Sequence, residues 1–157
     1  MDLTWRYAQF DALSGHDVYA ILDLRLRVFC LEQASPYHDT DGLDQSAMHL
    51  LGIDGDRLVA YLRVLPRGAR FADHTIGRVV VDPTNRKRGV GLALVHEGLR
   101  QLFAASGGPV ATALAAQAHL ERFYGSLGYV RTAREPFLED GILHVDMRRD
   151  AVALSMR

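Results

Sequence analysis

A basic, glycine-containing segment, "RKRGVG" from Arg86 to Gly91, holds the residues whose types and spacing best suit binding chemistry. Its two glycines permit backbone geometries that a side chain would forbid, and they let a ligand approach the main chain closely. Apolar residues at helical spacing follow, and the first turn of a helix offers free N–H groups and a positive dipole end. The segment therefore predicts an anion site suited to a phosphate. The alternative is an ordinary helix start with solvated basic side chains.

The spacing does not match the two most familiar phosphate-binding loops. A nucleoside-triphosphate loop needs G-x-x-x-x-G-K-[ST], and neither Gly89 nor Gly91 provides one. A dinucleotide fingerprint needs a third glycine at the position that Leu94 occupies. The pattern that remains is R-x-x-G-x-G.

The elements on either side must place this segment between a strand and a helix. Residues 74–81, "HTIGRVVV", are apolar and β-branched and stop at Asp82-Pro83, which predicts a buried strand. Residues 91–105 carry apolar side chains at helical spacing, and the run 107–109, "GGP", predicts the end of that helix. The basic loop is thus expected to join the carboxyl end of a strand to the amino end of a helix.

The rest of the chain alternates strand and helix patterns. Ser14 and Asp17 predict a capping box for a helix that ends near Gln33, and the run 54–56, "DGD", predicts a hairpin turn. We expect further strands at residues 4–10, 48–53, 57–65, 110–115, 129–133 and 142–148, and a helix at 117–127. The last two strands join across residues 139–141. The order β-α-β-β-β-α-β-α-β-β predicts a mixed α/β fold in one domain, residues 1–157.

The composition excludes several classes of partner. The net charge is -1 over 157 residues, so no overall field favours nucleic acid or an anionic membrane. No apolar run approaches the length of a membrane span, and the start lacks the pattern of a signal peptide. A single cysteine, Cys30, rules out an internal disulfide and fits a reducing compartment. We therefore expect a cytoplasmic protein without a nucleic-acid or membrane partner.

The sequence does not predict a metal site or a cysteine nucleophile. The segment 39–44, "DTDGLD", places its glycine and its twelfth residue wrongly for a calcium loop. The seven histidines lack H-x-x-x-H spacing. Cys30 lies between Phe29 and Leu31 on a predicted helix, without a basic partner beside it.

With the preceding "VVVDP" of residues 79–83, the R-x-x-G-x-G segment resembles the acetyl-CoA-binding signature of the GNAT superfamily of N-acetyltransferases. The segments "RLRVFCLEQASPYHDTDGLD", "AQAHLERFYGSLGY" and "EDGILHVDM" resemble its ElaA-like branch. The resemblance implies a GNAT-type fold, in which helices flank a mixed central sheet. The strands at 75–81 and 110–115 would splay apart, and the pantetheine of acetyl-CoA would lie between them.

The resemblance also implies a set of cofactor contacts. The first strand would offer backbone groups to pantetheine, the basic loop would hold the pyrophosphate, and Gln117 stands where the family often has a cofactor-contacting Asn. The implied cofactor-binding residues are Val79, Val80, Val81, Arg86, Lys87, Arg88, Gly89, Val90, Gly91, Leu92 and Gln117.

Tyr124 is the candidate general acid for acyl transfer from a thioester to an amine. It follows Gln117 by seven residues, so on a helix the two would share a face. The resemblance implies that a Tyr at this position reaches the CoA sulfur. A phenol with a pKa near 10 can donate a proton to a departing thiolate without ionising at rest. Packing beside Phe123 is the alternative role for this side chain.

The base and the acceptor pocket are less sharply defined. His144 alternates with Ile142 and Asp146 in the last strand and is a candidate base, although a structural histidine or a water chain fits equally. The acceptor pocket is expected between the first helix, the loop after it and the last hairpin. Glu32, Tyr37 and His49 are its candidate residues. Glu32 and His49 are also weaker candidates for the base. Asp39, Asp41 and Asp44 would attract a cationic amine or merely be solvated.

These observations favour an enzyme that moves an acetyl group from acetyl-CoA to a primary amine by direct attack in a ternary complex. The acceptor would be a small molecule or a peptide amine. A non-catalytic module that binds acyl-CoA as a sensor or structural ligand is the alternative. The resemblance also implies that a homodimer is possible.

Overall fold

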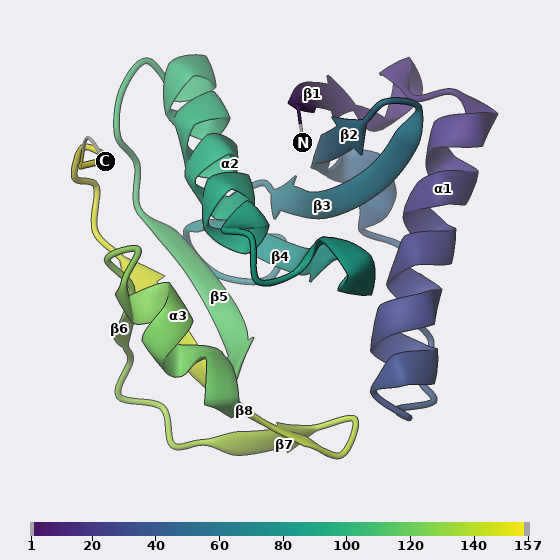
Figure 1. Cartoon of the computed structure of the whole chain (residues 1–157). Coiled ribbons are helices and arrows are strands. Elements are labelled where there is room, and N and C mark those ends of the chain that lie inside the picture. The colour runs from purple at the N-terminus through teal and green to yellow at the C-terminus, as the bar shows by residue number, and fades with distance from the viewer. Residues whose placement is uncertain (1, 156–157) are drawn as a thin grey trace.

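A computed structural model describes residues 2–155, in which an eight-stranded mixed sheet lies between helices (Figure 1). The strands are β1 (Leu3–Gln9), β2 (Met48–Asp54), β3 (Arg57–Leu65), β4 (His74–Val81), β5 (Thr112–Gln117), β6 (Val130–Arg131), β7 (Phe137–Glu139) and β8 (Ile142–Arg149). The helices are α1 (Gly15–Arg25), α2 (Val90–Ser106) and α3 (Glu121–Gly125). Single helical turns occupy Phe10–Ala12, Asp44–Ser46, Pro83–Asn85 and Ala118–Leu120.

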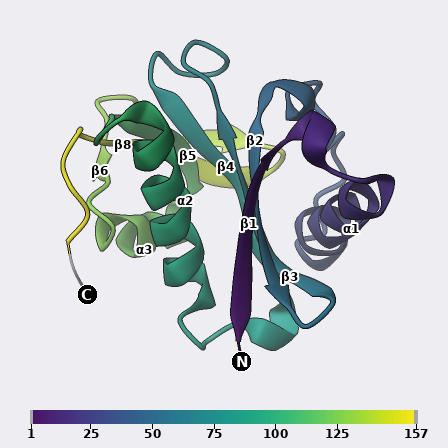
Figure 2. The same ribbon diagram turned by 90° about the horizontal axis from the view of Figure 1, so that it is seen from above.

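The sheet separates two apolar cores. Its order is β1-β2-β3-β4-β5-β8-β6, and β7 pairs with β8 outside this path. Helix α1 covers one face, and α2 and α3 cover the other (Figure 2). The larger core lies between the sheet and α2, around Leu62, Leu94 and Leu99, and the smaller one joins α1 to Tyr61 and Val80. This burial positions the loop between β4 and α2, since both of its neighbours are anchored in the larger core.

Several local predictions are confirmed. Ser14 Oγ accepts from the Asp17 N–H at 3.0 Å, and Asp17 Oδ2 accepts from the Ser14 N–H at 2.8 Å, which is the predicted capping box. The helix continues past α1 as a wider π-helical stretch, Leu26–Glu32, and ends at Gln33 as expected. The β2–β3 hairpin turns at residues 55–56, where Gly55 has a φ of +65°.

The predicted helix at 117–127 is wrong at its start. Gln117 is the last residue of β5, where it pairs with His144 of β8, and only the five residues of α3 form an α-helix. Pairing with β8 gives the backbone of Gln117 a ladder partner, and this outweighs the helical pattern of its side chains. Gln117 and Tyr124 therefore do not share a helical face.

The last part of the chain contains one strand more than predicted. Only Val130–Arg131 of the predicted strand at 129–133 pairs with β8, and Phe137–Glu139 forms the additional strand β7. The turn at Asp140-Gly141 joins β7 to β8, with φ values of +49° and +78° that suit a two-residue hairpin. The sequence signal for β7 is weak because Pro136 directly precedes a strand of three residues.

A β-bulge marks the middle of β4. Tyr61 pairs with Val80 and Arg63 pairs with Gly77, so Arg78 and Val79 together oppose one residue of β3. Arg78 adopts a φ of +50°, which is uncommon outside glycine. Because side chains alternate along a strand, this extra residue decides which face each of the following valines meets.

A network of three arginines and three aspartates holds the bulge and the long loop after α1. Arg25 binds Asp39 at 2.7 Å and Asp44 at 2.8 Å. Arg63, with a side chain only 1% exposed, binds Asp41 at 2.5 Å and Asp44 at 2.9 Å. The bulge residue Arg78 completes the network: its Nη2 donates to the Asp39 carbonyl at 2.9 Å, and its Nε lies 2.9 Å from Asp39 Oδ1.

The network changes the pKa values of its carboxyl groups. Burial by itself would raise the pKa of Asp44, but hydrogen bonds and charge from Arg25 and Arg63 outweigh it and lower the pKa. The pKa of Asp41 is likewise lowered, because hydrogen bonding and charge from Arg63 outweigh its burial. The expectation that these aspartates present free negative charge is therefore wrong, since arginines neutralise them.

We predict that Asp44→Asn lowers the free energy of unfolding by about 3 kcal/mol at pH 7, because it leaves two buried guanidinium groups short of a charged partner. The folded pKa of Asp44 lies below its unfolded value, so this stabilisation is complete above about pH 4 and is lost as the pH falls through the folded pKa. Urea titrations of both proteins between pH 7 and pH 2 measure the difference.

The matched control is Asp23→Asn, which breaks an exposed pair with Arg27 and should change stability by less than about 0.5 kcal/mol. A difference between Asp44→Asn and the parent that persists unchanged to pH 2 would contradict the ionic origin of the effect.

Candidate functional site

The candidate site begins where β4 and β5 part. The two strands pair in parallel only at His74–Thr112 and Thr75–Ala113, and beyond these pairs they diverge (Figure 1). The remainder of β4 keeps β3 as its neighbour on one edge only. The splayed strands implied by the family resemblance are therefore present.

The backbone of Val81 faces this gap. The Asp82 N–H donates to the Val59 carbonyl at 2.8 Å, so the main-chain groups of Asp82 point toward β3. Main-chain groups alternate along a strand, so those of Val81 point toward β5. The side chain of Val80 is 3% exposed and belongs to the core beneath α1, whereas Val79 and Val81 pack against the core beneath α2.

Asp82 fixes the start of the loop between β4 and α2. One carboxylate oxygen accepts from Thr84 N at 3.0 Å and from Thr84 Oγ1 at 2.7 Å, and the other lies 3.2 Å from both Arg27 Nη1 and Arg57 Nη2. Burial would raise the pKa of Asp82, but the bonds from Thr84 and the charge of Arg27 outweigh it and lower the pKa. The carboxylate thereby anchors a turn that runs over Pro83–Asn85.

The basic loop itself is exposed and curled. Lys87 has a φ of +62° and Gly89 a φ of +76°, and α2 begins directly afterwards at Val90. Lys87, Arg88 and Gly89 are exposed, whereas Val90 is 3% exposed and packs in the larger core. A buried first residue thus holds the amino end of α2 in place under an accessible loop.

The next two cofactor-binding candidates, Gly91 and Leu92, lie in the first turn of α2 and are half-buried. A Cβ at Gly91 would lie 3.5 Å from the ring of Phe123, which is ordinary contact. Leu92 lines a surface groove with Trp5 and His96.

Arg86 and Glu32, which the sequence assigns to different parts of the site, bind each other. The two guanidinium nitrogens lie 2.5 and 3.1 Å from the Glu32 carboxylate, and Arg86 Nε donates to the Val81 carbonyl at 3.2 Å. The neighbouring Gln33 reaches the opposite wall, where its Oε1 accepts from Gln117 Nε2 at 3.0 Å. Consecutive residues at the end of the first helix therefore contact the β4 loop and the end of β5.

Tyr124 is buried, with an exposed fraction of 6%. Its ring meets Phe123 edge-on at 4.9 Å and Tyr129 at 6.0 Å. Its hydroxyl makes no hydrogen bond to any other residue in the range 2–155, and burial raises the pKa of the phenol above its ordinary value. The ring of Tyr124 therefore packs in the core, while its hydroxyl has no hydrogen-bond partner among residues 2–155.

His144 lies directly across the β5–β8 ladder from Gln117. Its Nδ1 is 2.7 Å from the Ile142 carbonyl and donates to it, which leaves the Nε2 lone pair free in the neutral ring. Nε2 is 3.9 Å from Glu139 Oε2, and the ring stacks on Phe137 at a centroid distance of 5.9 Å. The sequence predicts His144 and Gln117 separately, and the ladder register brings them together.

His49 and Tyr37 are engaged in structural contacts. His49 is 1% exposed, donates from Nε2 to the Asp44 carbonyl at 2.8 Å and accepts at Nδ1 from the Tyr61 hydroxyl at 2.7 Å. Burial lowers the pKa of His49, which keeps the ring neutral. Tyr37 donates to Asp39 Oδ1 at 3.0 Å. Neither side chain has a free group directed at a ligand.

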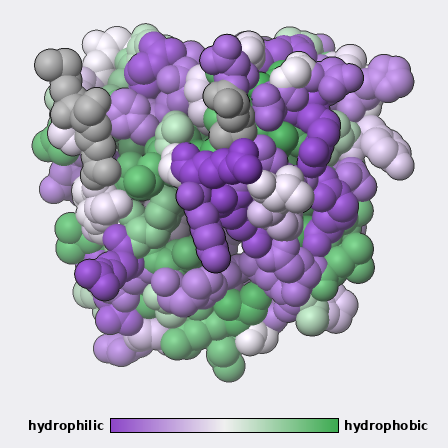
Figure 3. Space-filling view, viewed as in Figure 1, coloured by the Kyte–Doolittle hydropathy of each residue, from purple (hydrophilic) through white to green (hydrophobic). Residues whose placement is uncertain are grey.

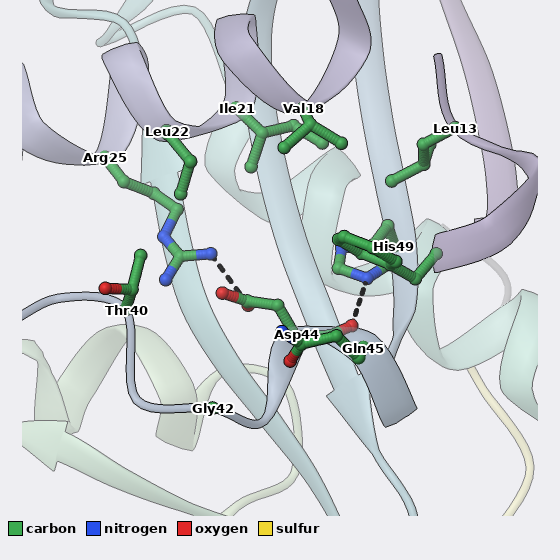
Figure 4. Close-up of a pocket in the computed structure, with 11 residues that line it drawn as sticks. Leu13, Val18, Ile21, Leu22, Arg25, Thr40, Gly42, Asp44, Gln45 and His49 are labelled. Carbon is green, nitrogen blue, oxygen red and sulfur yellow. Dashed lines mark hydrogen bonds and ion pairs between the residues drawn. The ribbon is translucent and has the colours of Figure 1, made fainter. Parts of the chain in front are cut away.

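A small pocket beside α1 illustrates the same point (Figure 4). Leu13, Val18, Ile21 and Leu22 form its apolar wall, and the polar side chains opposite them are held by the Arg25–Asp44 pair and by the bond from His49 to Asp44. Arg25, Asp44 and His49 are therefore engaged with one another in the wall of this pocket.

Sequence reasoning missed Arg25, Arg63 and Arg78, the residues that neutralise the acidic loop. Arg25 lies among the apolar positions of the first helix, and Arg63 and Arg78 lie within apolar strands. A cation in an apolar run needs a buried partner, and the loop rich in aspartate is the segment that supplies one. That charge balance was the available signal.

Metal-binding clusters and membrane-spanning helices are both absent from the described part of the chain. Within residues 2–155, no group of three His, Cys, Asp or Glu side chains is arranged to hold a metal ion. No helix in the same range is long and apolar enough to span a membrane.

Comparisons with known proteins agree with this geometry. Residues 12–151 match the acetyltransferase (GNAT) domain family. Protein ElaA of Escherichia coli is 37% identical over 152 residues, which cover 96% of this chain and 98% of that protein. The crystal structure of an acyl-CoA N-acyltransferase from Pseudomonas aeruginosa has a TM-score of 0.88 at 37% identity, covering 94% of this chain and 99% of that one.

A more distant structure shares the fold. An aminoglycoside 6'-N-acetyltransferase, solved in complex with coenzyme A, has a TM-score of 0.69 at 17% identity over 96% of this chain and 99% of its own. Taken together, fold and family support the class of acyl-CoA-dependent acyltransferases. The chain belongs to the GNAT acetyltransferase family and is similar to its ElaA proteins.

The two loop glycines should respond oppositely to substitution by alanine. We predict that Gly89→Ala lowers the free energy of unfolding by about 1 kcal/mol, because its positive φ disfavours a side chain. Gly91→Ala should raise it by about 0.5 kcal/mol, because Gly91 lies inside α2 and its new Cβ meets nothing closer than 3.5 Å. Thermal and urea unfolding of both variants measure the two signs, and a loss of stability in Gly91→Ala would refute the helical geometry of Gly91.

Proposed function

We propose that this protein transfers an acetyl group from acetyl-CoA to a primary amine by direct attack in a ternary complex. The observation that carries the proposal is the gap between β4 and β5, with the main-chain edge of Val81 facing it beside the loop at the amino end of α2. An extended pantetheine can add to such an edge as a further strand would. The distant aminoglycoside acetyltransferase with this fold was solved with coenzyme A, which supports the same cofactor class for this chain.

The residues present fit a CoA pyrophosphate. The exposed loop from Arg86 to Gly89 brings three cationic side chains to the amino end of α2, where free N–H groups and the helix dipole favour an anion. A Cβ at Gly89 would meet no atom within 4 Å, so the space above the loop is open to a ligand. We assign the pyrophosphate to the main chain and side chains of residues 86–92, with Arg86 also bound by Glu32.

Bound acetyl-CoA supplies the acyl group as a thioester, and the chain must supply a proton donor and a path for the proton of the amine. We assign the donor to Tyr124, whose hydroxyl has no partner among residues 2–155 and whose pKa is raised by burial. A phenol that stays protonated can donate to a departing thiolate. His144, whose Nε2 lone pair is free in the neutral ring, is the candidate base, with a water chain as the alternative.

The acceptor is assigned to the face of the sheet that α1 covers. The loop after the helix contacts the β7–β8 turn there, since Ser35 Oγ donates to the Asp140 carbonyl at 2.7 Å. Gln33 and Gln117 join the helix end to β5 on the same side. These contacts support an acceptor site between the first helix, its following loop and the last hairpin.

One assay distinguishes an acetyltransferase from a module that binds acyl-CoA without catalysis. Purified protein is incubated with acetyl-CoA and a panel of small primary amines, and release of free CoA thiol is followed against the rate without amine. An enzyme raises thiol release with at least one amine, and mass spectrometry finds the N-acetyl product. Saturable binding of CoA without any amine-dependent release would favour a binding module.

Gly91→Ala tests the phosphate assignment. We predict that its affinity for CoA falls at least tenfold, because the new methyl group would fill the space between the amino end of α2 and the ring of Phe123, beside the main chain assigned to the pyrophosphate, even though the folded protein is not destabilised. Gly15→Ala is the matched control, since Gly15 also lies in the first turn of a helix, α1, and a Cβ there would meet no atom within 4 Å. Titration calorimetry measures the affinity of both variants for CoA, and equal affinities would contradict the assignment.

Tyr124→Phe tests the proton donor. We predict that kcat falls about 100-fold at pH 7 while the affinity for CoA stays within twofold, because the ring packing is kept and the donor is lost. Tyr129→Phe is the control: its hydroxyl is already paired with Thr112 at 2.7 Å, so it should lose about 1 kcal/mol of stability and keep its kcat. Unchanged turnover in Tyr124→Phe would remove Tyr124 from this role.

A further inference from the structure

Asp146 carries a buried carboxylate oxygen without a partner. The side chain is 8% exposed, and its Oδ2 accepts from Arg134 Nη1 at 3.0 Å. Its Oδ1 is buried and makes no hydrogen bond within residues 2–155, and no other carboxylate oxygen there shares that state. A buried polar atom without a protein partner is costly unless a water or a ligand group completes it.

The one cation that meets Asp146 within the described range reaches it from the protein surface. Arg134 lies in the irregular segment 132–136 between β6 and β7, and its side chain is 55% exposed. Its guanidinium carbon sits 3.7 Å from the centroid of the Phe137 ring. Only the arginine half of this pair is exposed, since the Asp146 side chain is buried. Another cation could replace Arg134 from the solvent side and would keep the buried carboxylate paired.

Together Asp146 and Phe137 form the two surfaces that recognise an organic cation. A carboxylate binds the charged N–H groups, and an aromatic face attracts the cation by its quadrupole. Phe137 stacks in turn on His144, with the rings inclined by 22°, which holds the face in place. The guanidinium of Arg134 thus occupies a ready-made cation site.

The register places this site beside the gap. Leu114 and Ala116 of β5 pack in the core beneath α2, so Ala115 and its ladder partner Asp146 face the opposite side of the sheet. Ala115 lies two residues beyond the last β4–β5 pair, at Ala113. Asp146 therefore lies on the side assigned to the acceptor, where the two strands have parted.

Thr75 gives an independent sign of a site on the same face. Its Oγ1 is also buried without a hydrogen bond in the described range, and it lies opposite Ala113 in the ladder. The acidic residues of the loop after α1 are not competitors for a cation, because three arginines already neutralise them. Glu139, in the neighbouring strand β7, pairs with Arg70 at 3.0 Å.

We propose that Asp146 and Phe137 form a subsite for a second cationic group on the acceptor amine, and that Arg134 occupies this subsite until the acceptor displaces it. An ammonium held by a carboxylate stays protonated and is not a nucleophile, so the group bound in this subsite is not the amine that reacts. The acceptor class is therefore a diamine or another amine with a second positive charge. No bond forms or breaks in the subsite, and this inference rests on the proposed acetyltransferase function.

The test compares 1,4-diaminobutane with butylamine, which lacks the second cation. Asp146→Asn should lower kcat/KM for the diamine at least tenfold, to the value for butylamine. The kcat/KM for butylamine and the affinity for CoA should both stay within twofold of the parent values. Arg134→Ala should lower KM for the diamine severalfold, because it removes the competing guanidinium. The control Arg131→Ala breaks an exposed pair with Glu121 at 3.7 Å and should leave kcat/KM unchanged for both amines.

Opposite signs for the two variants distinguish a subsite from a structural ion pair. If the ion pair only stabilises the fold, Asp146→Asn and Arg134→Ala would change kcat/KM in the same direction as each other, and would do so for both amines. That result overturns the proposal. Thermal unfolding of each variant identifies a loss caused by misfolding.

A binding measurement keeps the test independent of turnover. Methylguanidinium should bind Arg134→Ala, seen by saturation-transfer NMR, and should not bind the double variant that also carries Asp146→Asn. If methylguanidinium binds in this way but the protein acetylates no amine, the proposed function is contradicted and the cation subsite is still supported. Acetylation of both amines with no dependence on Asp146, and no methylguanidinium binding, would defeat the subsite alone.

Discussion

The structure depends on the early end of the parallel pairing between β4 and β5. Pairing stops after Thr75 and Ala113, so one edge of β4 is left facing a gap while its other edge stays bonded to β3. An unpaired main-chain edge inside a sheet is costly unless something completes it. Helix α2 begins directly after the loop that follows β4, so its amino end comes next to the diverging part of that strand in the chain.

Buried charge maintains that arrangement. Arg78 sits in the bulge of β4 with a positive φ, and its side chain is held by Asp39 from the loop after the first helix. Arg25 and Arg63 fix the same loop from α1 and β3. Charges removed from water require complete pairing, so the network specifies one position for the loop and for the bulge. The three aspartates of this loop are each paired with arginine.

Much of the fold could be predicted from the sequence because its signals are local. The capping box at Ser14, the turn at Gly55 and the strand–loop–helix unit around Gly89 each depend on neighbouring residues. The helical prediction for Gln117 fails because its pairing with β8, much further along the chain, leaves no local trace. The pairing of Arg86 with Glu32 and the neutralised acidic loop are likewise products of tertiary contacts. Figure 3 shows hydrophobic surface at the lower edge of the molecule, where Figure 1 places β7. Leu138 of β7 is 73% exposed.

Amide hydrogen exchange of Val81 and of residues 89–92, measured by NMR with and without coenzyme A, tests the central claim most directly. If the gap edge and the amino end of α2 bind the pantetheine and the pyrophosphate, exchange at these amides slows strongly on addition of coenzyme A, while amides of β2 on the far side of β3 are unchanged. Saturable binding of coenzyme A with no protection at Val81 and at residues 89–92 would contradict it.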